Sequence, residues 1–254
     1  MIYSKAQQEY VEKNYTPVTG ALKNKMACFF IVSLHQIPIR TFSMTNFIPI
    51  FPLAIVVYPG EELNLHIFEP RYKQLISECK STGKAFGITP VINKRISELG
   101  TLVDIIELSK TYSNGEMDIK TRGNRIFRVL EEIKDVPEKL YSGAIVSYPH
   151  NKEHGNRLLM QKVINGIREL HKLLKVSNEF KKAENELLSY DVAHHAGLSL
   201  KEEYELLSLL DELHRQEYLK RHLTKVIPVV AEMEELKKKV KLNGHFKNLS
   251  GLDL

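Results

Sequence analysis

The chain has 254 residues, of which 43% are hydrophobic, so it can bury the core of one large or two small globular domains. Its formal net charge is +5, but five basic and two acidic residues place +3 of that charge in residues 1–43. The remaining 31 basic and 29 acidic residues nearly cancel, which argues against a nucleic-acid partner. The two cysteines form no CxxC pair or Cys/His cluster, so we expect a reducing, cytoplasmic location and no structural metal.

The first 43 residues show neither sustained alternation nor a long helical stripe. The most apolar run of the chain, Met26 to Leu34, is shorter than the roughly 18 residues that a membrane-spanning helix needs. It also begins late for a signal peptide, and no A-x-A-like cleavage site follows it. We therefore expect no membrane partner, and we expect residues 1–43 to be either a disordered leader or a mis-assigned start before Met44.

From Phe47 to Pro149 the pattern predicts short strands. In residues 63–68, Leu63, Leu65 and Ile67 alternate with Asn64, His66 and Phe68, which is typical of a half-buried strand. Further strands are predicted at residues 85–92, 101–108, 116–122, 125–130 and 143–148.

One helix and one tight hairpin are predicted within this half. Pro70 suits a first helical position, and apolar residues follow at helical spacing until Gly83. Asn114-Gly115 is the residue pair that best tolerates the positive φ values of a tight hairpin.

From Asn156 the apolar period changes to that of helices. Four are expected: a first from about Leu159 to Leu174, a second over residues 180–188, a third capped by Ser199 and continuing to Leu213, and a long last one with a kink or restart at Pro228. The cluster of Pro, Asn and Gly between Pro149 and Gly155 predicts a boundary between a β domain, residues 44–150, and a helical domain, residues 151–254.

The common catalytic signatures are missing. The chain contains no phosphate-binding G-x-x-x-x-G-K-[ST], no G-x-S-x-G and no G-x-G-x-x-G, so we expect no cofactor and no catalytic residues. His150 to His154 fits the zinc-peptidase pattern H-x-x-E-H, but it lies in the predicted linker, which favours a solvated segment over a metal site. The adjacent His194 and His195 favour packing or surface roles, and Glu61-Glu62 favours solvated charge in a turn.

The segment from Phe51 to Tyr72 resembles the opening of the amino-terminal substrate-binding domain of Lon proteases. In that family a Pro-Leu pair, a short strand, Pro-Gly and a second strand lead into a helix that begins near an Arg. The matching residues here are Pro52-Leu53, Ile55 to Tyr58, Pro59-Gly60, Leu63 to Phe68 and Arg71, followed later by Gly100, Asn114-Gly115, Gly123 and Arg125. Asn64-Leu65 stands in place of the Pro-Leu often found on the second strand, and the ending from His66 to Tyr72, HIFEPRY, is more similar to stand-alone bacterial members and to the Lon-like part of cereblon.

This resemblance implies an α+β protein with a PUA-like β pseudo-barrel followed by an α-helical bundle. It implies a non-catalytic, proteolysis-associated module that binds unfolded, extended or tagged polypeptide, as an adaptor with a separate protease or chaperone as a further partner. The ATPase and Ser-Lys protease activities of Lon are not expected, because the sequence ends at Leu254 without these domains.

The candidate contacts with a polypeptide are in the β half, with the groove between barrel and bundle as a second candidate surface. These residues are Tyr58, His66, Phe68, Glu69 and Tyr72. Structural roles compete for several of them, since Phe68 and Tyr72 can staple the helix start and Glu69 can cap it. An RNA-binding PUA-like module is the alternative, and the oligomeric state stays open because the apolar stripe from Leu219 to Val240 can close within one chain or between two.

Overall fold

A computed structural model of the chain describes residues 46–177 and 179–249, with side chains up to residue 241. All of them belong to one compact unit, Phe42–Leu254. The expectation about residues 1–43 lies outside the described residues.

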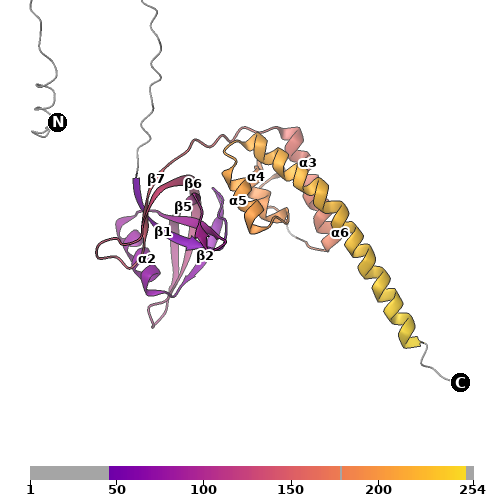
Figure 1. Ribbon diagram of the computed structural model, residues 1–254, viewed down its shortest axis with the longest axis horizontal. Coiled ribbons are helices and arrows are strands. Elements are labelled where there is room, and N and C mark those ends of the chain that lie inside the picture. Colours follow the sequence, from indigo (N-terminus) through magenta and orange to yellow (C-terminus); the bar gives the residue numbers. More distant parts are fainter. Residues whose placement is uncertain (1–45, 178, 250–254) are drawn as a thin grey trace, which may run out of the picture. The chain divides into compact units, whose positions relative to one another are not determined.

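Strands of alternating polarity close into a barrel in the β half (Figure 1). The closure comes from a parallel pairing of the first strand with the third, since the other neighbours are antiparallel. The closed path runs through β1 (Asn46–Leu53), β7 (Gly143–Ser147), β6 (Met117–Ile133), β5 (Leu99–Thr111) and β3 (Phe86–Ile92). Off this path, β2 (Glu62–Ile67) pairs with β6, and β4 (Arg95–Ile96) pairs with β3.

The alternation predicted for residues 63–68 is confirmed, because Ile67 is buried and Asn64, His66 and Phe68 are exposed. Two predicted strands are confirmed as strand residues but form one continuous strand, and a third predicted strand is absent. Residues 116–122 and 125–130 are parts of the single strand β6, in which Gly123 stays paired with Val103. The segment Ile55–Tyr58 is not a strand. The Thr101 hydroxyl donates to Val57 O, and the Tyr58 N–H donates to the Glu61 carboxylate. Side chains therefore satisfy backbone groups that would pair with another strand in a sheet.

The helix α2 (Pro70–Thr82) follows the prediction at both ends. Pro70 occupies the first turn, and Gly83 ends the helix with a left-handed φ of 63°. Its buried face, which includes Leu75 and Ile76, packs with Phe51, Phe86 and other barrel residues in one hydrophobic cluster. The hairpin is also confirmed, because Gly115 has a φ of 79° between β5 and β6.

The helical half contains α3 (Arg157–Leu174), α4 (Ser189–Val192), α5 (Leu200–Ser208) and α6 (Glu212–Leu249), with single turns of 3-10 helix at η1 (Glu184–Glu186) and η2 (Ala193–His195). The predicted capping box is present: Glu202 N–H donates to Ser199 Oγ, and Ser199 N–H donates to the Glu202 carboxylate. Among the described residues, no helix is long and apolar enough to cross a bilayer.

Two helix predictions are wrong, and one of the two alternatives for Pro228 is excluded. Residues 180–188 form no α-helix beyond the turn η1, and among them only Leu187 is buried, so a helix here would have little apolar face to bury. The third helix ends at Ser208 because Asp211 accepts the Leu213 N–H and starts α6 instead. Of the kink or restart expected at Pro228, the restart is absent, because Pro228 lies inside the continuous helix α6.

A hydrophobic cluster joins the two halves. Val56, Tyr58, Leu99 and Ile126 of the β half pack with buried residues of the helical half such as Tyr190. The Tyr58 hydroxyl donates to the Glu203 carbonyl at 3.1 Å, and its ring stacks on that of Tyr190 with centroids 5.0 Å apart. These contacts fix the side of the barrel that faces the helices.

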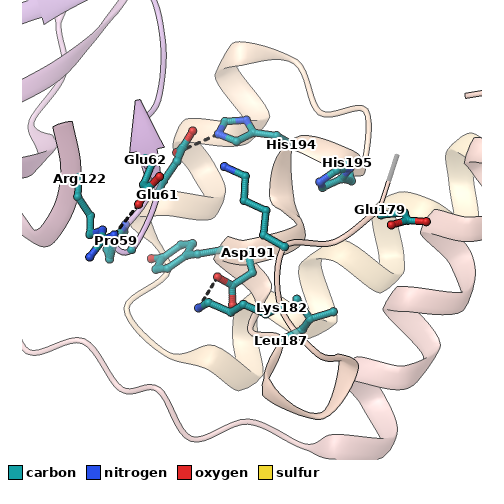
Figure 2. A pocket seen from close by; sticks show the side chains of 13 residues that line it. Pro59, Glu61, Glu62, Arg122, Glu179, Lys182, Leu187, Asp191, His194 and His195 are labelled. Carbon is teal, nitrogen blue, oxygen red and sulfur yellow. Dashed lines mark hydrogen bonds and ion pairs between the residues drawn. The ribbon is translucent and has the colours of Figure 1, made fainter. Parts of the chain in front are cut away.

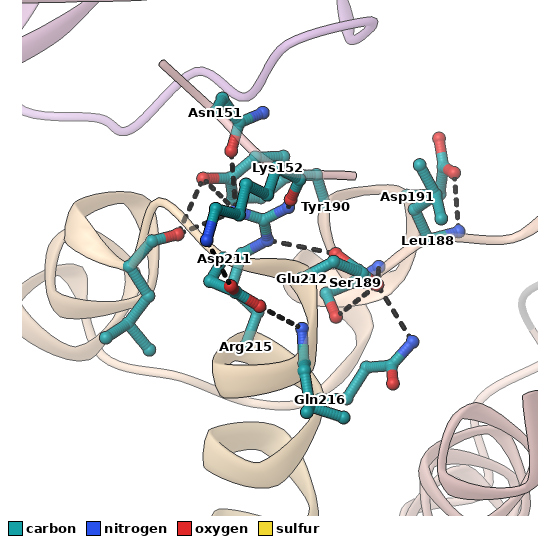
Figure 3. Close-up of polar contacts among 12 residues, drawn as sticks. Asn151, Lys152, Leu188, Ser189, Tyr190, Asp191, Asp211, Glu212, Arg215 and Gln216 are labelled. Carbon is teal, nitrogen blue, oxygen red and sulfur yellow. Dashed lines mark hydrogen bonds and ion pairs between the residues drawn. The ribbon is translucent and has the colours of Figure 1, made fainter. Parts of the chain in front are cut away.

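A buried ion pair anchors the connection between the halves (Figure 3). Arg215 is 1% and Glu212 0% exposed, and Arg215 Nε lies 3.0 Å from Glu212 Oε2. The same guanidinium donates to Asn151 Oδ1 at 2.8 Å and to the Lys152 carbonyl at 3.2 Å. The Glu212 carboxylate accepts the Ser189 N–H and hydroxyl, both at 2.8 Å. The segment around Asn151 is therefore tied to both α4 and α6.

Candidate functional site

The five candidate contact residues separate into a buried and an accessible group. Tyr58 is 0% and Tyr72 is 7% exposed, whereas Phe68 is 59% exposed. Tyr72 packs on Phe51 with ring centroids 3.9 Å apart, so both tyrosines support the fold instead of offering a surface. His66 and Phe68 lie at the exposed end of β2.

Glu69 takes the N-cap position of α2 without a capping hydrogen bond from its side chain. Its carboxylate pairs instead with Arg71 Nη2 at 2.7 Å. The guanidinium of Arg71 lies 4.6 Å from the centre of the Tyr72 ring. The Glu69 side chain therefore pairs with Arg71 and does not cap α2.

His66 is the centre of an exposed aromatic cluster. Its ring lies 6.2 Å from that of Phe68 and 5.7 Å from that of Tyr112. Asp118 on the neighbouring strand β6 binds both His66 Nδ1 and the Tyr112 hydroxyl at 2.7 Å. The hydrogen bond to Asp118 raises the pKa of His66, and the same bond lowers the pKa of Asp118. Asp118 thus fixes two rings beside the exposed Phe68.

Within residues 46–177 and 179–249, one edge of the strand β2 pairs with no other strand, and we call it the free edge of β2. Among the described strands, β6 is its only neighbour, in a register that runs from Glu62↔Arg122 to Ile67↔Met117. A strand with one neighbour presents backbone N–H and C=O groups on its other side. Leu63 and Leu65, which are half-buried, flank this edge on the inner face, and Phe68 follows on the outer face.

A groove of about 770 Å³ lies where β2 begins, between the turn at Pro59-Gly60 and the helical half (Figure 2). Leu187 and Tyr190 provide apolar lining, and Lys182, which pairs with Asp191 at 2.7 Å, lines the groove beside them. This is the groove between barrel and bundle that the sequence suggests as a second surface.

His194 connects the two walls of this groove. Its Nε2 atom lies 3.1 Å from Glu61 Oε2, and its Nδ1 atom lies 2.7 Å from Glu203 Oε1. Burial alone would lower the pKa of His194, but hydrogen bonds to the carboxylates of Glu203 and Glu61 outweigh it and raise the pKa to about 10. Glu61 is therefore an ion-pair partner and not a solvated turn residue. Sequence reasoning missed this pair because 133 positions separate its members.

The basic side chains of β6 that lie opposite β2, Lys120 and Arg122, are compensated by one carboxylate. Glu62 pairs with Arg122 at 2.5 Å and with Lys120 at 3.1 Å. Hydrogen bonds from both cations lower the pKa of Glu62 to about 2. These two cations are therefore paired, whereas Lys110 of β5 lies 4.4 Å from the centre of the Tyr112 ring and forms no ion pair among the described residues.

The H-x-x-E-H segment lies outside any helix. His150 and His154 are exposed, and the segment between them has no helical turn that would bring both rings to one side. Over the part of the chain that the structure describes, no group of three or more His, Cys, Asp or Glu residues is arranged to hold a metal ion.

The motif residues shape the β half. A Cβ atom on Gly123 would clash with the Tyr58 carbonyl, and one on Gly100 would lie 2.5 Å from the Ile88 carbonyl. Gly60, with a φ of 85°, follows Pro59 in the turn beside the groove. Arg125 stacks over Tyr148 at 3.8 Å. Pro52 and Leu53 end β1 opposite Thr89 and Pro90 of β3.

Comparisons with known proteins agree with this architecture. The family model of the substrate-binding domain of ATP-dependent protease La (LON) matches residues 48–225. The crystal structure of a Lon N-terminal domain protein from Xanthomonas campestris is similar with a TM-score of 0.54 and 27% identity, over 68% of this chain and 96% of that one. The N-terminal domain of Mycobacterium avium complex Lon protease has a similar fold, with a TM-score of 0.53 and 14% identity over 70% of this chain and 98% of that one.

Proposed function

Because the chain belongs to the Lon substrate-binding domain family, we propose that it is a recognition module that binds unfolded or extended polypeptide along the free edge of β2. The observation that carries the proposal is the pairing of β2, which has β6 as its single neighbour among the described strands. An extended segment can add to such an edge through backbone hydrogen bonds. These bonds do not depend on the client's sequence, which suits a module that recognises many unfolded chains.

Side chains around the edge supply a mild preference for apolar clients. A peptide strand added beside β2 would place alternate side chains on the two faces of the sheet. Those on the inner face would meet the half-buried Leu63 and Leu65, and those on the outer face would meet His66 and Phe68. Phe68 is 59% exposed, so it has apolar area to lose on binding.

The groove extends this surface. Glu61 and Glu62, at the start of β2, line it, so an extended client that follows the edge is led toward Leu187 and Tyr190. In this proposal residues 44–150 form the binding domain, and residues 151–254 form a helical domain that completes the groove. The module would act in the cytoplasm as an adaptor that delivers clients to a separate protease or chaperone.

The RNA-binding alternative has less support. Sequence-tolerant RNA binding requires unpaired cations beside exposed aromatic rings. The aromatic cluster around His66 instead contains the carboxylates of Asp118 and Glu116, and Lys120 and Arg122 both pair with Glu62. An anionic ligand would therefore meet two carboxylates and two paired cations, and Lys110, which lies 4.4 Å from the centre of the Tyr112 ring, is a cation that could contact it at this cluster.

The test uses a fluorescently labelled polypeptide whose cysteines have been reduced and alkylated so that it cannot fold. Fluorescence anisotropy would measure its dissociation constant for the full chain and for Phe68→Ser. We expect about tenfold weaker binding of the variant, which corresponds to the ~1.4 kcal/mol of one useful apolar contact.

Leu140→Ser is the matched control, because Leu140 is 66% exposed and lies in the loop after β6, where its N–H donates to Gln74 of α2 and not to β2. It should bind as tightly as the unsubstituted chain. Equal binding by all three proteins would remove the β2 edge from the proposal. Binding of a labelled RNA oligonucleotide at low salt, with no binding of the polypeptide, would replace the proposal by the RNA-binding alternative.

A further inference from the structure

The second half of α6 has an apolar stripe that nothing in the described chain covers. Leu219 and Leu223, in the first half, are buried in the cluster that also contains α3 residues. Beyond them, four apolar side chains at spacings of four, three and four residues face solvent. These are Val229, Met233, Leu236 and Val240, which are 57%, 53%, 54% and 70% exposed. This spacing is that of a coiled-coil seam.

Charge is distributed unevenly along the stripe. Glu232, Glu234 and Glu235 form an acidic block, and Lys237 to Lys239 with Lys241 form a basic block directly after it. Glu234 pairs with Lys237 at 2.6 Å within the helix. Within the described part of the chain, Glu232 and Lys239 form no ion pair. A partner that carries a basic block opposite residues 232–235 and an acidic block opposite residues 237–241 would complement the stripe.

A second copy of α6 that runs in the opposite direction presents this order of charges. If a second copy of α6 runs antiparallel, so that Met233 faces Leu236 of that copy, the spacing also brings Val229 opposite Val240. The same register places Glu232 beside Lys239 of the second copy, at the flanking positions where antiparallel coiled coils form ion pairs. A parallel pair would place the two lysine blocks side by side. We infer that α6 is a self-association surface on which a second copy of this chain packs antiparallel through Val229, Met233, Leu236 and Val240.

Sedimentation velocity of the full chain over a range of concentrations tests the inference. We expect a monomer–dimer equilibrium, and we expect the double variant M233E/L236E to be monomeric at concentrations at which the unsubstituted chain is dimeric. The control L140E adds the same charge at an exposed leucine of the β half and should leave the dimer intact. A chain that is monomeric at every concentration, or that forms trimers, would overturn the inference.

Disulfide cross-linking tests the orientation. With Cys28 replaced by Ser and Cys79 buried, a cysteine introduced into α6 would be the accessible thiol. Antiparallel packing predicts that V229C and V240C cross-link when the two variants are mixed, and that neither cross-links well alone. Strong cross-linking of each variant with itself would contradict the antiparallel arrangement. Polypeptide binding by the monomeric M233E/L236E variant should be unchanged, so this inference and the proposed function can fail separately.

Discussion

The Nε2 atom of His194 lies 3.1 Å from Oε2 of Glu61, so a side chain of the helical half is paired with a carboxylate of the β half. The pKa of His194 is raised from 6.5 to about 10 in the folded state. A raised pKa means that the charged form stabilises the fold. Its contribution is complete below a pH of about 6.5 and is lost as the pH rises through about 10.

We therefore expect His194→Gln to destabilise the chain at pH 6 and to have a much smaller effect at pH 10. The difference at pH 6 should be about 1 kcal/mol, because the side chain is 40% exposed and solvent screens the two ion pairs. Urea unfolding of both proteins at pH 6, 8 and 10 gives this difference. A destabilisation that stays constant between pH 6 and pH 10 would show that the charge of His194 is irrelevant.

The buried pair of Arg215 and Glu212 predicts a larger effect. Arg215→Met would leave the Glu212 carboxylate, which is 0% exposed, without its counter-ion. Removal of one member of a buried pair costs about 3–5 kcal/mol, so the free energy of unfolding should fall by about that amount. The double variant R215M/E212M should be more stable than R215M, because it leaves no uncompensated charge.

Arg128→Met is the control for this prediction, since Arg128 and its partner Glu98 are 44% and 61% exposed. Its unfolding free energy should change by less than about 1 kcal/mol. Hydrogen exchange should also be faster in R215M at Lys152 and Glu212, whose N–H groups donate to Leu210 O and Lys152 O in the connection between the halves. An R215M chain as stable as the unsubstituted one would contradict the anchoring role of the pair.

Gly123 predicts a backbone effect near the groove. Its hydrogen atom faces the carbonyl of Tyr58, and a methyl group there would clash with backbone that cannot easily move. Gly123→Ala should therefore destabilise the chain by about 1–3 kcal/mol, as overpacking usually does. Gly166→Ala provides the comparison, because its methyl group would meet the flexible Leu223 side chain at 3.2 Å within a helix. Equal losses of thermal stability in the two variants would show that the close approach of Gly123 to the Tyr58 carbonyl does not affect stability.

Local patterns in the sequence predicted much of the architecture. Alternation identified β2, Pro70 and Gly83 marked the ends of α2, and Ser199 marked the start of α5. Each of these signals comes from a few neighbouring residues. The resemblance in residues 51–72 supplied the fold and the family, which local patterns could not.

Features that depend on distant residues were not predicted. Residues 180–188 have helical spacing, but among them only Leu187 is buried. The pairing of Glu61 with His194, and of Arg215 with the segment around Asn151, requires the packed halves. Only part of the candidate surface could be predicted. Local alternation exposes His66 and Phe68, but the burial of Tyr58 depends on its stacking with Tyr190, which is distant in the sequence.

The most direct test of polypeptide recognition is an NMR titration of the isotope-labelled chain with an unfoldable, reduced and alkylated polypeptide. Recognition at the free edge of β2 predicts that the backbone amides of β2, residues 62–67, and of Phe68 shift first and most. It also predicts that hydrogen exchange at alternate β2 amides slows when the polypeptide is bound. No change along β2 at saturating polypeptide, or changes restricted to the helical half, would contradict the proposal that the free edge of β2 recognises clients.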